Sequence, residues 1–363
     1  MEYRFEDILE IRNGKNQKAV ENPEGRYPIY GSGGVIGYAD DYICEADTII
    51  IGRKGSINNP IYVSEPFWNV DTAFGLSVKK DFVLPKYLYY FCKKFDFGKL
   101  NKTVTIPSLT KSDLLKIKIN VPVKEEQQAI IDKLMKIESI MAFRKIELDY
   151  LDVLIKARFV EMFGDPITNP KEWKMVELGK LTTIGSSKRI FEKEYVSEGI
   201  PFYRTKEIVE LSKGNSISTE LFITKERFFE IKDKYGVPKK GDLLVSAVGT
   251  IGVIWIVDGS NDFYFKDGNL IRVDASEKFD SVYMKNLLEN LIDDYKKQMS
   301  TGTTYNALTI SGLTKLKVYD VPIELQNLFS EFVNQVYKSK VTVQKALEET
   351  QILFDSLMQK YFG

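Results

Sequence analysis

Histidine is absent from the 363-residue chain, and cysteine occurs only twice, at Cys44 and Cys92. Without histidine the chain can form no Ser-His-Asp or Cys-His triad and no histidine-ligated metal site, and it lacks the most common general base near neutral pH. Two cysteines are too few for a zinc ribbon or for the disulfide framework of a small secreted domain. We therefore expect a reduced protein with no metal site and no catalytic residues of its own.

Net charge and long apolar runs are missing as well. The 51 lysine and arginine residues balance 51 aspartate and glutamate residues, and residues 1–123 and 164–323 are each close to neutral, with 17 basic against 15 acidic and 23 of each. Any affinity for DNA must then come from small local patches or from a partner. No apolar run approaches the roughly 18 residues of a membrane span. The N-terminus also lacks a signal-peptide pattern, so we expect a cytoplasmic protein without membrane contact.

The sequence does contain an internal duplication, and such repeats decide the architecture of a chain. The run YPIY at 27–30 parallels IPFY at 200–203, 173 positions later, and FG at 163–164 parallels FG at 362–363, 199 positions later. The growing offset gives the second copy 26 extra residues, most of them between Tyr203 and Asp242. Three further matches keep the same order along the chain. The first aligns Ile11 with Ile184 and Lys15 with Lys188, the second aligns Asp47 with Asp242 and Gly55 with Gly249, and the third aligns Leu109 with Leu308 and Pro122 with Pro322.

Each copy begins with mixed secondary structure and ends in a long helix. Short alternating runs such as DTIIIG and GVIWIV predict strands with short helices between them, whereas residues 124–163 contain neither glycine nor proline. We predict an α+β fold in which two globular α/β domains are separated by two long antiparallel coiled-coil helices, with an internal pseudo-two-fold repeat. The expected ranges are 1–123 and 175–323 for the domains, 124–163 and 324–363 for the helices, and 164–174 for a proline-rich linker.

A heptad pattern of apolar residues supports pairing of the two long helices. A ~38-residue helix at ~1.5 Å per residue is ~57 Å long, more than a small globule can cover, so a seam of this length needs a long partner. The alternative is that each stripe packs only on its own globule. The predicted seam residues are Ile130, Leu134, Ile137, Met141, Leu148, Leu151 and Ile155 in the first helix, with Arg144 as the polar interruption, and Phe329, Val333, Val336, Val343, Leu347 and Phe354 in the second.

Polar and basic residues recur at equivalent places in both globules. Arg, Lys, Asn, Ser and Thr on loops are the side chains that contact phosphates and base edges, although any single one can be an ordinary solvated residue. The trio Asp165, Glu172 and Lys174 resembles the spacing of magnesium nucleases, but these residues lie in a proline-rich linker and not on paired strands, and such a site needs fixed geometry to hold the ion. The residues that we predict to bind DNA are Lys15, Arg53, Lys54, Ser56, Asn58, Lys102, Thr103, Lys188, Arg189, Arg204, Thr205, Lys206, Ser246, Thr250, Thr303, Tyr305 and Asn306.

Two motifs and the duplication together point to one family. VPVKEEQQAI at 121–130 leads into the first long helix, and FVEMFGDPITNPKEWKMVELGKL at 159–181 follows it. With the repetition of globule plus helix over the whole chain, they make the sequence resemble the specificity subunit of type I restriction–modification systems. The second copy, VPIELQNL, departs from the pattern because it lacks the pair formed by Glu126 and Gln127.

The resemblance implies a function. In that family each globule reads one half of a bipartite, interrupted DNA target, and the coiled coil sets the spacer and docks the methylation subunits. The implied partners are double-stranded DNA, two methylation subunits and, in the full complex, restriction subunits. The resemblance also implies that this chain is not an enzyme and holds no cofactor, since S-adenosylmethionine and ATP are expected on the partner subunits.

Two other functions remain open. A coiled-coil interaction scaffold whose globules bind protein is compatible with the neutral charge, and a weak salt dependence of DNA binding would favour it. A solitary nuclease or methyltransferase is disfavoured by the lack of histidine and of a glycine-rich cofactor loop, and turnover by the isolated chain would be its signature.

Overall fold

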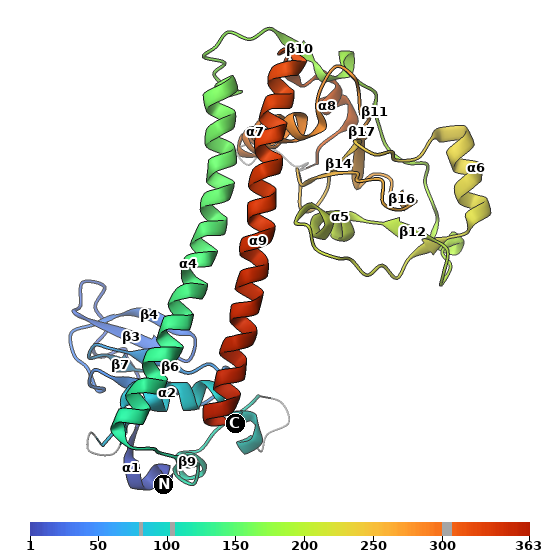
Figure 1. Cartoon of the computed structure of the whole chain (residues 1–363). Coiled ribbons are helices and arrows are strands. Elements are labelled where there is room, and N and C mark those ends of the chain that lie inside the picture. The colour runs from blue at the N-terminus through green and yellow to red at the C-terminus, as the bar shows by residue number, and fades with distance from the viewer. Residues whose placement is uncertain (80–82, 102–105, 300–306) are drawn as a thin grey trace. The chain divides into compact units, whose positions relative to one another are not determined.

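The computed structural model describes residues 1–79, 83–101, 106–299 and 307–363. The chain divides into two compact units, of which unit 1 comprises Met1–Glu147 with Val343–Gly363 and unit 2 comprises Leu148–Thr342. Two 40-residue helices, α4 (Lys124–Phe163) and α9 (Ile323–Phe362), each contribute a part to each unit (Figure 1). The compact units therefore cut across the five consecutive segments expected from the sequence, because each globule packs on parts of both helices.

The described strands of unit 1 form three small sheets with short helices around them. They are β1 (Glu2–Arg4), β2 (Leu9–Asn13), β3 (Tyr27–Gly31), β4 (Gly34–Ala39), β5 (Thr48–Gly52), β6 (Ile61–Val63), β7 (Trp68–Asn69), β8 (Ala73–Val78) and β9 (Lys118–Asn120). The helices are α1 (Phe5–Ile8), α2 (Pro85–Lys94), η1 (Phe97–Leu100) and α3 (Lys111–Leu115). The sheet orders are β1-β9, β2-β8-β5-β6 and β4-β3-β7. The run of β-branched residues in β5 is buried throughout, as suits an interior strand.

Unit 2 repeats this topology strand for strand. Its strands are β10 (Met175–Glu177), β11 (Ile184–Gly185), β12 (Ile200–Tyr203), β13 (Phe222–Ile223), β14 (Leu243–Ser246), β15 (Ile254–Ile256), β16 (Tyr264–Phe265), β17 (Leu270–Val273) and β18 (Lys317–Tyr319). Its helices are η2 (Leu178–Lys180), η3 (Glu192–Glu194), α5 (Thr205–Ser212), α6 (Lys225–Tyr235), α7 (Ser281–Met299) and α8 (Ile310–Lys315). The orders are β10-β18, β11-β17-β14-β15 and β13-β12-β16, and the parallel pair β3·β7 recurs as β12·β16. The internal repeat is confirmed.

The strand register corrects one of the aligned pairs. Ile49 and Leu243 lie opposite equivalent positions of β8 and β17, so the counterpart of Asp242 is Thr48 and not Asp47. Thr48 and Asp242 are both buried. Aligning two identical aspartates introduced a one-residue slip, which in a strand would turn every side chain to the opposite face of the sheet.

Within each unit α4 and α9 run antiparallel and in contact. In unit 1, Arg144 of α4 donates to the carbonyl of Ala346 and, at 2.7 Å, to the hydroxyl of Thr350. In unit 2, Lys340 of α9 lies 2.5 Å from the carboxylate of Asp152, so later positions on α4 meet earlier positions on α9. All thirteen predicted apolar seam residues are buried or half-buried.

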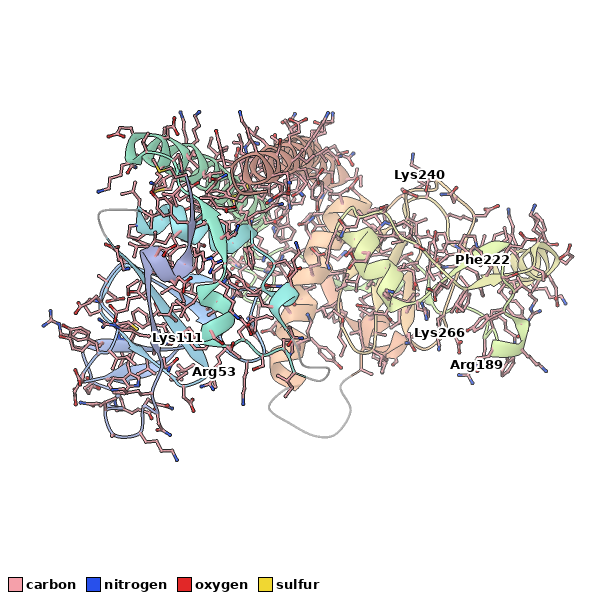
Figure 2. The ribbon with its side chains drawn as sticks, turned by 90° about the horizontal axis from the view of Figure 1, so that it is seen from below. Arg53, Lys111, Arg189, Phe222, Lys240 and Lys266 are labelled. Carbon is pink, nitrogen blue, oxygen red and sulfur yellow. The ribbon has the colours of Figure 1, made fainter. Side chains whose placement is uncertain are left out.

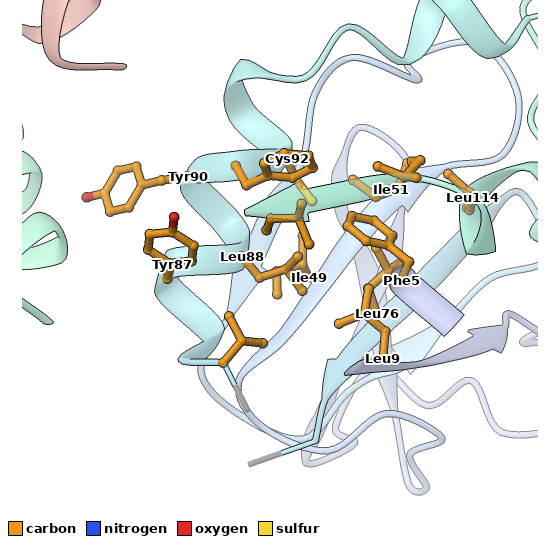
Figure 3. Close-up of a cluster of buried hydrophobic side chains, with 14 of the residues drawn as sticks. Phe5, Leu9, Ile49, Ile51, Leu76, Tyr87, Leu88, Tyr90, Cys92 and Leu114 are labelled. Carbon is orange, nitrogen blue, oxygen red and sulfur yellow. The ribbon is translucent and has the colours of Figure 1, made fainter. Parts of the chain in front are cut away.

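Both globules close their cores with side chains from the long helices. Phe5, Ile49 and Leu76 of unit 1 lie in one apolar cluster with Leu134 of α4 and Phe354 of α9, and Figure 3 shows the globule's part of this cluster. The corresponding cluster of unit 2 includes Leu178, Leu243, Val273, Phe159 and Phe329. Because the second copy is longer between β12 and β14, the helices α5 and α6 are inserted there, on either side of β13, which is the counterpart of β4. A further cluster forms around α6, with Ile190, Phe202, Ile223, Phe228 and Tyr264 among its residues.

Two buried glutamines tie the globules to the long helices. Gln127 accepts a hydrogen bond from the amide of Leu84, just before α2, and donates to the carbonyl of Pro122, both at 2.8 Å. Gln326 accepts from the amide of Asp280, just before α7, and donates to the carbonyl five positions earlier in the chain, both at 2.9 Å. The second helix lacks the Glu-Gln pair, as the sequence indicates, because Leu325 stands at the place of Glu126, but it keeps the glutamine and both of its hydrogen bonds.

The linker after α4 is an ordered cap of that helix. Gly164 adopts a positive φ of 80°, which ends the helix in the left-handed conformation that favours glycine. The indole of Trp173 donates to the carbonyl of Phe163 at 2.9 Å, and the ammonium of Lys171 donates to the carbonyl of Glu161 at 2.6 Å. These bonds satisfy carbonyls that a helix end leaves without partners. The segment that contains the Phe-Gly-Asp-Pro motif therefore has a structural role, which is to end α4.

Candidate nucleic-acid interface

Each unit holds one loop in the same backbone frame, between β5 and β6 in unit 1 and between β14 and β15 in unit 2. The amide of Arg53 donates to the carbonyl of Thr72 at 2.7 Å, and its carbonyl accepts from the amide of Leu109 at 2.9 Å. At the equivalent place the amide of Ala247 donates to the carbonyl of Asn269 at 2.8 Å, and its carbonyl accepts from the amide at position 308, at 3.0 Å. The two loops are thus anchored at equivalent points.

The tips of the two loops also have the same conformation. Gly55 and Gly249 both have a φ of 76°, a left-handed conformation that costs glycine little and other residues much more. Their carbonyls accept hydrogen bonds from the amides of Ile57 at 2.8 Å and Ile251 at 3.0 Å. The pairing of these glycines in the sequence therefore holds in the structure.

The side chains on these loops differ between the units. Arg53, Lys54 and Ser56 are exposed in unit 1, and Arg53 also lies over the ring of Phe74. Figure 2 labels Arg53 on this unit. In unit 2 the exposed loop residues are Val248 and Thr250. One loop therefore offers cations, and the other offers an aliphatic side chain and a hydroxyl.

Two of the residues predicted to contact DNA form hydrogen bonds within the protein instead. Ser246 is fully buried, and its hydroxyl donates to the carbonyl of Thr250 and accepts from the amide of Val253 at 2.9 Å. This corrects our expectation that Ser246 faces a ligand. Asn58 is exposed, but its side-chain amide donates to the Asp96 carboxylate at 2.9 Å and accepts from the backbone N–H of Phe97 at 2.7 Å. Asn58 therefore anchors η1.

Lys15 of unit 1 and Lys188 of unit 2 are two further basic residues predicted to bind DNA. Lys15 is exposed, and its backbone amide donates to the carbonyl of Asn69 at 2.8 Å. Asn69 lies three residues before Thr72, whose carbonyl accepts from the amide of Arg53. In unit 2 the ammonium of Lys188 lies 5.4 Å from the ring centre of Tyr235. Both residues follow shortly after β2 or β11, the strands that belong to the loop-carrying sheets.

Arg189 belongs to a cavity of unit 2 that the sequence did not reveal. Its guanidinium pairs with Asp267 at 2.8 Å, and both residues line a cavity of about 360 Å³ together with Lys266 and the exposed ring of Phe191. Arg189 and Lys266 lie close together in Figure 2. Lys266 was missed because no local pattern marks it: it comes from a strand end distant in sequence.

The cluster at the start of α5 is divided in its roles. Arg204 pairs with the buried carboxylate of Glu207 at 3.0 Å, and this hydrogen bond raises the pKa of the guanidinium. Thr205 is half-buried, whereas Lys206 is exposed. Of the three predicted contacts, only Lys206 is both exposed and without an ion pair among the described residues. The predicted residues Lys102, Thr103, Thr303, Tyr305 and Asn306 lie outside the described part of the chain.

No candidate catalytic centre emerges in the described part of the chain. Asp165 of the nuclease-like trio accepts amide hydrogen bonds within the linker, and Lys174 pairs with Asp320 at 3.3 Å. The described residues hold no cluster of three or more acidic or cysteine side chains placed to bind a metal ion. Nor does any described helix combine the length and the apolarity that a membrane crossing needs.

The family model of the type I restriction modification DNA specificity domain matches residues 1–150 and 170–351. The chain belongs to this family. The membership confirms the resemblance seen in the sequence, and with it the expectation of a DNA-specificity component that is not itself an enzyme.

Individual relatives and solved structures agree with the family assignment. The chain is 28% identical over 334 residues to a Haemophilus influenzae protein named as a type I restriction enzyme specificity subunit, over 89% of this chain and 84% of that one. It is 25% identical over 339 residues to the type I restriction enzyme MjaIX specificity subunit of Methanocaldococcus jannaschii, over 85% of this chain and 74% of that one.

Two solved structures share the fold along the whole chain. One is the type I restriction–modification system S subunit from M. genitalium, with a TM-score of 0.60, 18% identity and coverage of 100% of this chain and 96% of that one. The other comes from work on complex assembly and conformational transition of the type I R-M system, with a TM-score of 0.65, 15% identity and coverage of 100% and 97%. They confirm the predicted fold class.

In this specificity-domain protein the long helices expose one apolar pair at equivalent places. Val153 and Leu154 of α4 are 58% and 44% exposed, and their counterparts 199 positions later, Ile352 and Leu353 of α9, are 68% and 51% exposed. The other large exposed apolar residues of these two fully described helices have no such counterpart; Phe143, for example, corresponds to a threonine. The heptad pattern does not include these residues, because it describes only the seam between the helices.

Proposed function

We propose that this chain is the cytoplasmic, sequence-specific DNA-binding subunit of a type I restriction–modification complex, and that each unit reads one half of a bipartite, interrupted target. The observation that carries the proposal is the pair of loops that share one backbone frame but present different side chains. Two copies of one reader with different contact residues suit a target whose two halves differ in sequence. Local cations such as Lys54 and Lys206 supply part of the attraction to DNA, and partners supply the rest.

The long helices serve as the spacer and as the docking surface for two methylation subunits. The apolar pair of α4 and its counterpart on α9 support this, because two copies of one partner require the same contact twice. Exposed aliphatic residues cost solvation free energy unless a partner covers them, and they are typical of interaction surfaces. Restriction subunits join in the full complex.

The chain contributes positioning and no chemistry. Its readers select the site, and the methylation subunit, which holds S-adenosylmethionine, flips an adenine out of the duplex and methylates it. ATP is bound by the restriction subunit. A stiff pair of helices fixes the number of unread base pairs, and readers spaced by about one turn, roughly 34 Å, contact the same face of the DNA.

The test is co-expression of the full chain with its methylation subunit, followed by methylation-sensitive sequencing of cellular DNA. We expect one interrupted motif with two different halves, and none in cells that lack the chain. DNA binding by the purified complex should weaken steeply with salt. Absence of a motif, together with weak salt dependence, would instead favour a protein-binding scaffold.

A further inference from the structure

The two equivalent loops allow a comparison of side chains at fixed positions. Lys54 and Val248 immediately precede Gly55 and Gly249, the two tip glycines that share one backbone conformation. The flanking backbone bonds are equivalent to within 0.2 Å of one another. A difference between the units at this position is therefore a difference in side-chain chemistry and not in placement.

Both side chains are available for contact. Lys54 is exposed, and its ammonium forms no ion pair among the described residues. Val248 is 42% exposed although it is aliphatic and follows the fully buried β14. Such exposure in a loop costs solvation free energy that contact with an apolar group would recover.

Each side chain matches one kind of base edge. A lysine ammonium donates to the O6 and N7 acceptors that guanine presents in the major groove, whereas an aliphatic side chain contacts the methyl group of thymine. We propose that Lys54 selects a guanine in the half-site read by unit 1 and that Val248 selects a thymine in the half-site read by unit 2. This inference rests on the proposed function and assigns one base of each half-site to one residue.

Exchange of the two residues in the full chain tests the assignment. Lys54→Val and Val248→Lys are each co-expressed with the methylation subunit, and the methylated motif is read by sequencing. We expect Lys54→Val to relax or change one guanine position in one half of the motif only, and Val248→Lys to change one thymine position in the other half only. Matched charge changes at exposed sites off the loops, Lys118→Val on β9 and Phe229→Lys on α6, should leave the motif unchanged.

Base analogues test the same contacts without altering the protein. Replacing the assigned guanine by 7-deazaguanine, which lacks N7, should weaken binding of the wild-type complex roughly ten-fold. Replacing the assigned thymine by uracil removes one methyl group and should weaken binding about four-fold. The uracil effect should vanish in Val248→Ser.

The outcomes separate this inference from the proposed function. A wild-type interrupted motif that neither loop exchange alters, with no analogue effect, overturns the assignment and leaves the proposed function standing. A wild-type complex without any motif overturns the proposed function itself. If an exchange abolishes methylation altogether, the analogue measurements on the wild-type complex decide.

Discussion

Gln127 and Gln326 are the clearest examples of single residues that the duplication preserves for a physical reason. Each amide side chain is buried, and each pairs with one backbone N–H and one backbone C=O at the junction of a short helix with a long one. Buried backbone groups without partners cost about 1–3 kcal/mol apiece. A glutamine can satisfy a donor and an acceptor at once, which no apolar residue of the same size can do.

Replacing either buried glutamine should therefore destabilise its unit. We expect Gln326→Leu to lower the free energy of unfolding by about 2–4 kcal/mol, because it leaves two buried backbone groups unpaired. Gln127→Leu should act similarly. Urea denaturation of the full chain measures the effect, and Gln128→Leu, one residue along α4 and exposed, is the matched control with little expected change. Equal stability of the Gln127 and Gln128 variants would show that water replaces the lost bonds.

The two cysteines should be unreactive in the folded protein. Both are buried, and loss of solvation raises the pKa of the Cys44 thiol to about 11. At pH 8 this thiol is protonated, and thiolate is the reactive form. We expect Ellman's reagent to label neither cysteine in the native chain and both in guanidinium. Fast labelling of the native chain would mean that the β5–β8 sheet opens readily.

At the scale of elements, Arg144 is the polar interruption of the helix pair. Its guanidinium reaches from α4 to the backbone and a side chain of α9, in a seam that is otherwise mostly apolar. Polar residues at such positions usually fix register and partner choice at some cost in stability. Thr350 also donates to the carbonyl of Ala346 at 2.7 Å, so that carbonyl keeps a partner without the arginine.

Arg144→Leu should leave stability unchanged or raise it by about 1–2 kcal/mol, since an apolar residue replaces a partly buried charge. It should also weaken the preference for one pairing, so that sedimentation velocity detects larger species absent from the wild-type chain. Lys145→Leu, at the exposed neighbouring position, controls for added apolar surface. A strictly unchanged size distribution with reduced stability would show that Arg144 stabilises the helix pair and does not select it.

The elements differ in how far the sequence predicts them. The extent of α4 follows from the absence of glycine and proline between Lys124 and Phe163, because only those residues break helices strongly. Strand register did not follow: identical aspartates at Asp47 and Asp242 suggested an alignment that the hydrogen bonds shift by one residue. The cap formed by Trp173 was invisible as well, since its bonds go to main-chain atoms that every residue possesses.

At the scale of the whole molecule, the duplication predicted more of the architecture than of the interface. Position pairs such as Gly55 and Gly249 were found because glycine is required at that φ in both copies. Contact residues were harder, because polar loop residues serve both as ligands and as internal anchors. Ser246 and Asn58 are polar loop residues, but Ser246 bonds within its own loop and Asn58 bonds to residues at the start of η1. No pattern in the sequence marks Val248 as exposed, because aliphatic residues are usually buried.

The repeated apolar pair on the helices predicts the stoichiometry of the complex. If Leu154 and Leu353 each form the centre of one docking site, a glutamate at either place buries a charge against a partner and should remove one methylation subunit, not both. Native mass spectrometry of the complex should then give two methylation subunits for the wild-type chain, one each for Leu154→Glu and Leu353→Glu, and none for the double variant. Gln351→Glu, on a different side of α9, should retain two. Loss of both subunits after a single substitution would mean that the partners bind as one preformed pair, and retention of both in the double variant would place the docking surface elsewhere.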